Sequence, residues 1–395
     1  MRLLPTQVFT PARLPLGQAN VYAPRDAELA IRTAFLMQRT PILFGDFGVG
    51  KTTTIRKIAM EFAPEWETFY FEATSHKAFS DFLRRFLETQ HYAVTKQVSE
   101  TTGEAGGSFL SFLALKGQHK EQQVTELLVS SPTDDRVLDI INERPRILII
   151  DELHKAAEPF KECLADFMKS IVNRELTNIR LAIVGTVHQP SELVKYDEGV
   201  RRIVQEVRIA PMNYRESSYI VREGMERCEL VIEQAVVHRI VELSGGSPSL
   251  IHELCLSCAN QAIAARSEQV TSVFVDLAVE ELLKGRYYQH HELWMRVAER
   301  SGDVRWRKQI LFAMALIGSE IIATEELSAK LSELLDRPVR SANYTAQMKE
   351  LQDKHKVISK VARKHGAEHA LWRFRDPSFR NFISVVWRQE QTKRR

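Results

Sequence analysis

The amino-acid sequence predicts an α/β protein whose first half is a doubly wound parallel sheet. Three observations support this prediction. Short apolar runs alternate with segments of helical periodicity between residues 24 and 210. One run, RILII at 146–150, is so apolar that both of its faces must be covered, as in a parallel sheet. A glycine-rich loop at 45–50 joins another run to a helix, in the order strand, loop, helix.

The elements of this sheet follow one another along the chain. Helical spacing of apolar residues at 24–39 ends before Pro41. A stretch rich in Gly, Thr, Ser and Gln at 95–131 lacks periodicity and predicts an insertion or long loop. We expect strands at 41–45, 67–73, 146–152, 179–186 and 202–210, and helices from the end of the glycine loop through Phe62 and at 76–90, 134–143 and 157–173.

The second half is predicted to be mostly helical. From 215 to 283 the pattern is helical throughout, with a break at SGGSP, 244–248. Residues 304–388 predict three helices, the second capped by Thr324, and then two strand-like runs around a turn at Gly366. This is the order of a winged helix. The predicted domains are an α/β domain at 1–212, which contains the insertion, a helical lid at 213–285 and a winged-helix-like domain at 286–395.

Charge is distributed unevenly along the chain. Residues 286–395 contain 22 Lys and Arg against 13 Asp and Glu, a net charge of +9, whereas residues 1–285 have a net charge of −6. A basic C-terminal quarter predicts either a partner that is a polyanion or a solvated surface. No apolar stretch is long enough to span a bilayer and no signal-peptide pattern is present, so we expect a cytoplasmic protein without membrane contact.

The loop GDFGVGKT at 45–52 matches the pattern G-x-x-x-x-G-K-[ST]. Its glycines allow successive backbone N–H groups to point at phosphate oxygens, and the following helix favours negative charge at its N-terminus. Lys51 is expected to reach the β- and γ-phosphates, and Thr52 the magnesium ion. The predicted ligands are therefore ATP and Mg²⁺, and the predicted contacts are Gly45, Asp46, Phe47, Gly48, Val49, Gly50, Lys51, Thr52 and Thr53.

A carboxylate pair ends the apolar strand at 146–152. Asp151 can hold magnesium together with Thr52, and Glu152 can orient and deprotonate a water that attacks the γ-phosphate. Acidic pairs at strand ends also occur as simple helix caps. Because a phosphate loop precedes this pair by about a hundred residues, we assign Asp151 to the metal and Glu152 to catalysis.

The order of these motifs resembles the AAA+ ATPases, in particular the replication initiators of the origin-recognition type and their bacterial relatives. YAPRDAEL at 22–29 is similar to the adenine-side box of that family, which implies nucleotide contacts from Tyr22 and Arg25. The polar residue that ends the fourth strand, Thr186, matches the family's sensor 1. EGVRRIVQEVRI resembles the arginine-finger segment, with Arg202 as the finger and Arg201 as the alternative. A finger acts on a neighbouring subunit, which implies a homo-oligomer.

The lid departs from that family pattern. Ser249 stands where the family usually has the sensor 2 arginine, after GGSP. The Gly-Gly-x-Pro sequence, with Pro248 expected beside the nucleotide, is also similar to the lid of the STAND signalling ATPases, in which ATP acts mainly as a switch. This departure predicts slow hydrolysis, with nucleotide binding and assembly as the output.

The resemblance extends to the C-terminal domain, because a winged helix follows the lid in origin-recognition proteins. It implies that the third helix enters DNA and that the wing touches phosphates. Candidate DNA contacts are Lys349, Arg363 and Lys364, and also Tyr344 and Gln347. The leading hypothesis is an ATP-dependent switch that oligomerises on double-stranded DNA, with a transposition helper ATPase as a variant. The alternative is a STAND-like signalling or defence ATPase that recruits a protein effector.

A second cluster of chemistry-bearing residues lies in the predicted lid. His252, Cys255 and Cys258 have the spacing of a metal or redox motif. They also fall on one face of an apolar helix, and no second cysteine pair follows. Small cysteines pack well in such a position, so the sequence favours core packing for all three.

Overall fold

A computed structural model describes the chain in two compact units. The sheet unit contains Asp26–Gly45 and Lys51–Ile209, and the helical unit contains Met1–Arg25, Asp46–Gly50 and Ala210–Arg395. The described residues are 3–46, 48–90, 135–185, 199–285, 287–299, 304–317, 321–361 and 370–394. The predicted insertion at 95–131 lies outside them. None of the helices in these ranges is long and apolar enough to cross a membrane.

The sheet unit has a five-stranded parallel sheet in the order β2-β3-β4-β1-β5. All residues of β3 are buried, as its apolar sequence predicts. The doubly wound parallel fold is therefore confirmed. The strands are β1 (Thr40–Phe44), β2 (Glu67–Glu72), β3 (Arg146–Asp151), β4 (Ile179–Val184) and β5 (Val204–Arg208).

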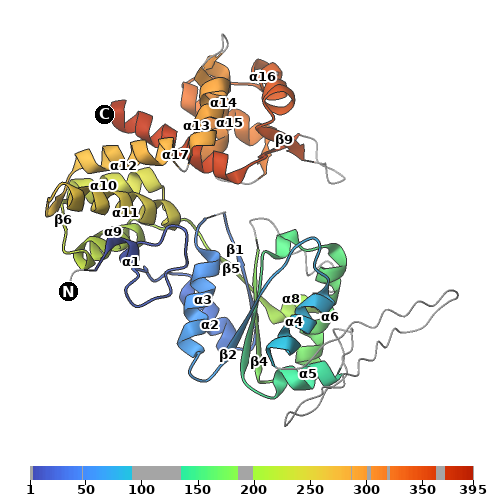
Figure 1. Ribbon diagram of the computed structural model, residues 1–395. Helices are drawn as coiled ribbons and strands as arrows, with labels where there is room; N and C mark the ends of the chain where they lie inside the picture. Colours follow the sequence, from blue (N-terminus) through green and yellow to red (C-terminus); the bar gives the residue numbers. More distant parts are fainter. Residues whose placement is uncertain are drawn as a thin grey trace, which may run out of the picture. The chain divides into compact units, whose positions relative to one another are not determined.

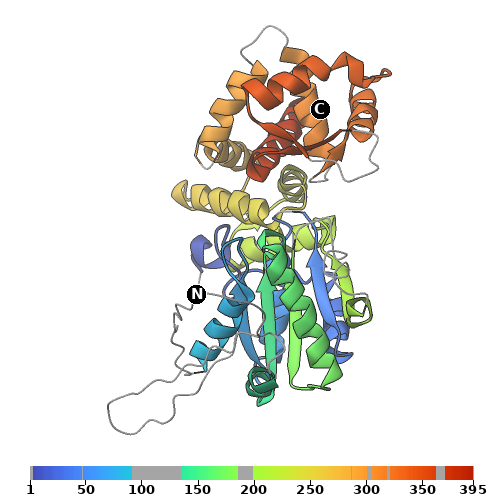
Figure 2. The ribbon, with the colours of Figure 1, turned by 90° about the vertical axis from the view of Figure 1, so that its right-hand side faces the viewer.

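Helices cover both faces of this sheet. Figure 1 shows α2 (Glu28–Leu36) and α3 (Lys51–Phe62) on one face. The other face carries α4 (Phe79–Thr89), α5 (Asp135–Asn142), α6 (Glu158–Asn173) and α8 (Val200–Ile203), which Figure 2 shows from a second direction. Phenylalanines from β2, α4 and α6 pack against one another in the core of that face. Burial of these rings stabilises the unit.

The register of the sheet brings the ends of its strands to one edge. Glu72 at the end of β2 is opposite Asp151 at the end of β3, and β1 ends one residue before Gly45. Strand β4 lies between β3 and β1. Because all five strands are parallel, the segments that follow β1 and β3 leave the sheet at the same edge, as in other open α/β sheets.

One predicted strand of the sheet begins later than expected. The sequence predicts a strand from 202, but Arg201 and Arg202 belong to α8, a single helical turn, and β5 begins at Val204. A turn of this length is too short to show helical periodicity in the sequence.

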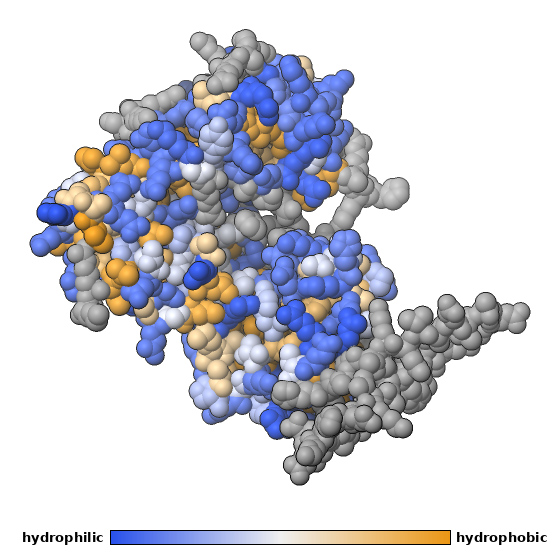
Figure 3. All heavy atoms as spheres, in the orientation of Figure 1, coloured by the Kyte–Doolittle hydropathy of each residue, from blue (hydrophilic) through white to orange (hydrophobic). Residues whose placement is uncertain are grey.

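Apolar side chains are exposed on the α2–α3 face of the sheet unit, where Figure 3 shows them gathered at the surface. Leu29 is 71% exposed and Leu36 is 75% exposed, and they lie two turns apart on α2. Met37, which follows α2, and Met60 of α3 are also exposed. An exposed apolar patch of this kind is typical of an interaction surface.

The lid part of the helical unit contains four helices and a short strand pair. The prediction of helix throughout 215–283 was wrong for β6 (Val231–Ile232) and β7 (Gln269–Val270), which pair in parallel. Two residues are too few to show a strand period. The predicted break is present: α10 ends at Ser244, its C-cap Gly245 has a φ of 56°, and α11 begins at Pro248. The helices are α9 (Tyr214–Arg227), α10 (Gln234–Ser244), α11 (Pro248–Ala264) and α12 (Ser272–Lys284), and α1 (Pro5–Val8) contacts α11.

The C-terminal part contains the three predicted helices and the two predicted strands, and further elements that the sequence did not reveal. These include α13, the strand β8, which makes a three-stranded antiparallel sheet in the order β8-β10-β9, and the 18-residue helix α17. The elements are α13 (Tyr288–Trp294), a π-helical turn (Met295–Glu299), α14 (Val304–Ile317), β8 (Ile322–Ala323), α15 (Thr324–Leu335), a 3₁₀ turn (Ser341–Asn343), α16 (Thr345–Lys349), a π-helical turn (Glu350–Lys354), β9 (Ile358–Val361), β10 (Leu371–Phe374) and α17 (Pro377–Arg394).

Thr324 does not cap α15, contrary to the sequence prediction. The N-cap is Ala323, and the Thr324 hydroxyl donates instead to the Ala370 carbonyl, at 2.8 Å, beside β10. A tertiary hydrogen bond has replaced the local one, which a sequence pattern cannot reveal.

The helical unit has one continuous core that includes His252, Cys255 and Cys258. The His252 Nδ1 accepts a hydrogen bond from the Thr10 backbone N–H at 3.1 Å, and burial lowers the pKa of His252 to about 4. This arrangement supports the core-packing interpretation. Among the described residues, no group of three or more His, Cys, Asp or Glu side chains is placed to hold a metal ion.

Candidate nucleotide site

The glycine loop has the backbone that its sequence predicts. Gly48 and Gly50 have φ of 81° and 94°, values that favour glycine over residues with a Cβ. A Cβ at Gly50 would lie 3.5 Å from the Pro248 ring, so Pro248 at the start of α11 is close to the loop. The side chain of Val49 is buried. Phe47 lies outside the described residues.

Arg25 holds this loop from within the helical unit. Its guanidinium donates to the Val49 carbonyl at 2.8 Å and to the Ala210 carbonyl at 2.5 Å. Its Nε pairs with Glu216 at 3.2 Å, and both side chains are buried. Glu216 is in turn fixed by the capping box of α9. The structure therefore shows Arg25 as a clamp on the loop backbone, while Tyr22, three residues before it, is half-buried.

The sheet unit contributes Lys51 and Thr52 from the first turn of α3, where Thr53 is half-buried. The Lys51 ammonium donates to the Gly45 carbonyl at 2.9 Å. The Thr52 hydroxyl donates to Asp151 Oδ2 at 2.7 Å. The two predicted magnesium ligands are thus in direct contact, although 99 positions separate them in the sequence.

Asp151 is buried and is held by three donors. Besides Thr52, the Tyr70 hydroxyl donates to Oδ2 at 2.7 Å and the Glu152 backbone N–H donates to Oδ1 at 2.7 Å. Burial, followed by the hydrogen bond to Asp151, raises the pKa of Tyr70, so its hydroxyl stays protonated as a donor. The guanidinium of Arg56 lies 3.7 Å from the centre of the Tyr70 ring.

Sequence analysis missed Tyr70 and Arg56. Tyr70 lies on β2 within the run ETFYFEA, whose aromatic residues are typical of any strand. Its contact with Asp151 depends on the pairing of β2 with β3, which the sequence does not specify. The signal that could have indicated this contact is an aromatic side chain with a hydroxyl group, on a strand beside the one that ends in Asp151.

Glu152 follows Asp151 in a left-handed backbone conformation, with φ of 58° and ψ of 33°. Strained backbone of this kind in residues other than glycine is concentrated at functional sites. The Glu152 carboxylate lies 3.0 Å from the Lys155 ammonium and 3.3 Å from His154 Nε2. The predicted base is therefore already paired within its own turn.

The finger, sensor 1 and basic DNA-contact candidates are either exposed or outside the described ranges. Arg201 and Arg202 are both exposed on α8. Thr186, Arg363 and Lys364 lie outside the described ranges. Lys349 is exposed at the end of α16.

The prediction that Tyr344 faces DNA was wrong. Its side chain is 1% exposed and its hydroxyl is 3.0 Å from the Thr324 carbonyl and 2.7 Å from the Ser328 hydroxyl. It packs in the core of the C-terminal part, with its hydroxyl held by two residues of α15.

Comparisons with known proteins agree with this geometry. Residues 37–189 match the family described as AAA domain. The structure is similar to Cdc6p from Pyrobaculum aerophilum, with 13% identity, 99% of this chain and 100% of that chain covered, and a TM-score of 0.50. No curated protein matches the sequence. At 13% identity the likeness to Cdc6p shows a shared fold, so the predicted AAA+ type of α/β fold is confirmed.

Two further solved structures are similar at a lower level. The Walker-type ATPase PABY2304 of Pyrococcus abyssi has 13% identity, with 94% of this chain and 98% of that chain covered and a TM-score of 0.49. The Orc1 protein of Aeropyrum pernix, solved in complex with DNA, has 16% identity, with 95% of each chain covered and a TM-score of 0.47.

Proposed function

We propose that this chain, whose residues 37–189 form an AAA domain, is a slowly hydrolysing ATP-dependent switch that assembles with copies of itself on double-stranded DNA. The observation that carries the proposal is the hydrogen bond from Thr52 to Asp151. Thr52 comes directly after a glycine loop that contains residues in a left-handed conformation. Phosphate loops combine these features to hold a nucleoside triphosphate and its metal ion.

The residues present fit magnesium and nucleotide. Thr52 and Asp151 offer oxygen ligands, which Mg²⁺ prefers, and Tyr70 and the Glu152 N–H orient the carboxylate. When bound, the ion neutralises part of the phosphate charge. Lys51, now on the Gly45 carbonyl, exchanges that acceptor for phosphate oxygens, and the loop N–H groups hold the phosphates in place.

Hydrolysis requires Glu152 to accept a proton from the attacking water. Its carboxylate is already in contact with Lys155 and His154, so at least one of these contacts must be released before the carboxylate can orient a water. Ser249 replaces the arginine expected in the lid, so the lid itself does not supply that positive charge to the transition state. Both features support slow turnover. Thr186 is proposed to align the water, as the family resemblance implies.

Self-association is supported by two surfaces of the sheet unit. Arg202 is exposed and is proposed to complete the site of a neighbouring copy, with Arg201 as the alternative. The apolar α2–α3 face, with Leu29 and Leu36, offers area that a second copy can bury.

DNA association is supported by the C-terminal part. The order α14, β8, α15, α16, β9, β10 is that of a winged helix, and the net charge of residues 286–395 is +9. Lys349 is exposed at the end of α16, and Arg363 and Lys364 are proposed to contact phosphate from the wing. The second candidate, a signalling ATPase that recruits a protein effector, is favoured by one observation: the Gly-Gly-x-Pro break with Ser249 in the lid.

The test of the nucleotide assignment is substitution of Lys51. Lys51→Ala removes the one side-chain cation within the loop motif, and fluorescent ATP should no longer bind in a titration, whereas Lys57→Ala on the same helix should bind normally. Unchanged affinity of Lys51→Ala would refute the proposal. Anisotropy of labelled duplex DNA, with and without ATP, separates the two candidate functions, since only the first predicts binding.

A further inference from the structure

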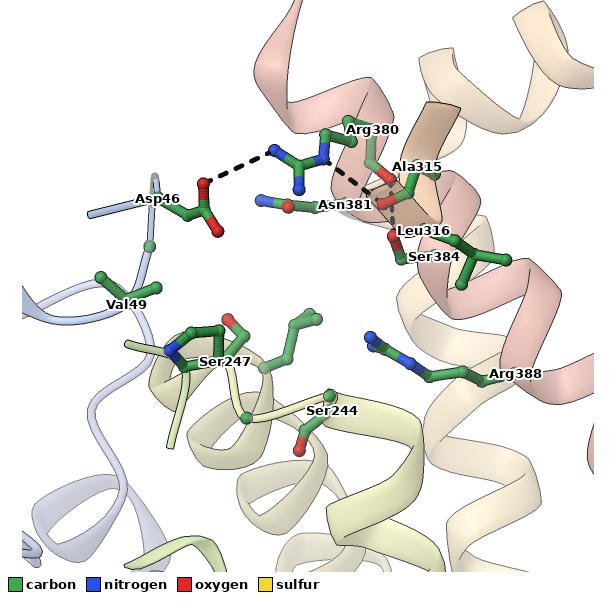
Figure 4. A pocket seen from close by; sticks show the side chains of 15 residues that line it. Asp46, Val49, Ser244, Ser247, Ala315, Leu316, Arg380, Asn381, Ser384 and Arg388 are labelled. Carbon is green, nitrogen blue, oxygen red and sulfur yellow. Dashed lines mark hydrogen bonds and ion pairs between the residues drawn. The ribbon is translucent and has the colours of Figure 1, made fainter. Parts of the chain in front are cut away.

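A cavity of about 230 Å³ lies within the helical unit, between the glycine loop and α17. The loop contributes Asp46, Gly48 and Val49 to its wall, and the α10–α11 break contributes Gly245 and Ser247. Figure 4 shows the side chains of Arg380 and Arg388 pointing from α17 into this space. The proposed phosphate loop and α17, a helix that sequence analysis did not reveal, therefore line the same cavity.

The polar residues of α17 that line the cavity form one stripe. Arg380, Ser384 and Arg388 are spaced four residues apart and so lie on the same helix face. Arg380 Nη1 is 3.9 Å from Asp46 Oδ1, which is a loose ion pair. Arg388 Nη1 donates to the Leu243 carbonyl at 3.2 Å, at the end of α10.

Gly245 explains how Arg388 comes so close to the lid. The guanidinium of Arg388 occupies the position that a Cβ at Gly245 would take. Gly245 also has a left-handed backbone, with φ of 56°, which favours glycine on its own account. The sequence thus leaves room for this arginine by having glycine at the C-cap of α10.

The cavity holds more positive than negative charge. Among the charged side chains that line it, Arg380 and Arg388 are cationic and Asp46 is anionic. Burial, followed by the charge of Arg380, lowers the pKa of Arg388, so the two cations oppose each other in a partly desolvated space. A phosphate group would relieve that repulsion and accept hydrogen bonds from both guanidinium groups.

We infer that Arg380 and Arg388 form an anion subsite that binds the terminal phosphate of the nucleoside triphosphate held by the glycine loop. This inference rests on the proposed nucleotide function. It assigns to α17 the cationic contact that the lid lacks at Ser249, whose hydroxyl instead donates to the Pro11 carbonyl at 3.2 Å. Arg380 exchanges its ion pair with Asp46 for an ion pair with the terminal phosphate. Because a nucleoside diphosphate lacks that phosphate, α17 distinguishes the triphosphate from the diphosphate.

The experiment compares the affinities of a non-hydrolysable ATP analogue and of ADP, by calorimetry, for the full chain and its variants. Arg380→Ala and Arg388→Ala should each weaken the triphosphate analogue by about tenfold, the value of a charge-assisted hydrogen bond, with little change for ADP. Arg388→Lys, which keeps the charge, should lose less than Arg388→Ala. Arg222→Ala, at an exposed position of α9, is the matched control and should change neither affinity.

Two results would overturn the inference. In the first, the two alanine variants keep the wild-type ratio of triphosphate affinity to diphosphate affinity. This happens if the two affinities are unchanged or if they are weakened by the same factor. In the second, inorganic phosphate alone binds to the Lys51→Ala protein in a manner that depends on Arg388, which would make the cavity a separate anion site. Either result leaves the loop assignment standing, because that assignment fails only if Lys51→Ala itself binds ATP normally. Thermal melting of each variant identifies any that fails to fold, and Arg388→Lys then supplies the comparison.

Discussion

The Thr52 hydroxyl donates a 2.7 Å hydrogen bond to the Asp151 carboxylate, and Tyr70 donates to the same oxygen at the same distance. One carboxylate oxygen is therefore fixed by two neutral hydroxyls on two different elements. Neither hydroxyl neutralises the charge of Asp151, so the carboxylate remains suited to a cation, and its orientation is set before one binds.

Removal of the Tyr70 hydroxyl should weaken the response to magnesium. Tyr70→Phe keeps the ring that Arg56 stacks on and removes one donor from Asp151. We expect the magnesium concentration that half-saturates ATP binding to rise about tenfold, as for other residues that orient metal ligands. Tyr219→Phe, on the surface of α9, should have no effect. An unchanged magnesium titration for Tyr70→Phe would exclude Tyr70 from the site.

Substitution of Glu152 should separate ATP binding from hydrolysis. Glu152→Gln keeps the shape of the side chain but cannot accept the proton of the attacking water, so phosphate release should fall by about two orders of magnitude while ATP affinity is retained. Lys155→Ala is the informative companion, because it removes the ion pair that occupies the Glu152 carboxylate. Wild-type phosphate release by Glu152→Gln would show that another carboxylate is the base.

Mixing of two inactive variants tests the proposed finger. Arg202→Ala protein should bind ATP but hydrolyse it poorly, and Lys51→Ala protein should not bind it. Oligomers that contain both variants have some sites with an intact loop from one subunit and an intact finger from its neighbour, so part of the activity should return. Arg201→Ala, one residue away on α8, is the matched control. If Arg201→Ala is the inactive variant and Arg202→Ala is active, the finger is Arg201; a fully active monomer would exclude both.

Salt dependence tests the DNA contacts. Each phosphate contact by Lys or Arg should contribute about 0.9 to the slope of log affinity against log salt. Joint replacement of Arg363 and Lys364 by Ala should lower the slope by nearly two, Lys349→Ala should lower it by about one, and Arg222→Ala should leave it unchanged. ATP affinity should be the same in all four proteins. Absence of duplex binding by the wild-type protein with ATP at low salt would favour the protein-effector alternative.

His252 should make the protein less stable in mild acid. The pKa of His252 is lowered to about 4 in the folded protein, against about 6.5 in an unfolded chain, so the unfolded state binds the proton first as pH falls. The stability conferred by the neutral imidazole is complete above pH 6.5 and is lost as pH falls towards 4, by up to about 3 kcal/mol. Urea unfolding measured across this range should show the loss, and His252→Gln should reduce it. A flat profile would contradict the assignment.

The sequence by itself determined the elements whose signals are local. The loop at 45–52 shows its chemistry in adjacent residues, and the apolar run ending at Asp151 shows both the burial of its strand and the place of its carboxylate. The turn at Gly245 and the start of α11 at Pro248 follow equally from the conformational preferences of single residues. These preferences depend on a few neighbouring positions, so no fold is needed to recognise them.

Tertiary structure decided which distant residues share a site. The pairing of β2 with β3 brings Tyr70 to Asp151, and α17 brings Arg380 and Arg388 to the cavity beside Asp46. Tertiary structure also redirected Thr324 from a local cap to the Ala370 carbonyl and buried Tyr344, which had been expected on the surface. Each of these outcomes depends on strand order and helix packing, which are set by the burial of apolar surface over the whole unit. The short sequence around any one of these residues therefore contains no signal that predicts where its side chain will lie.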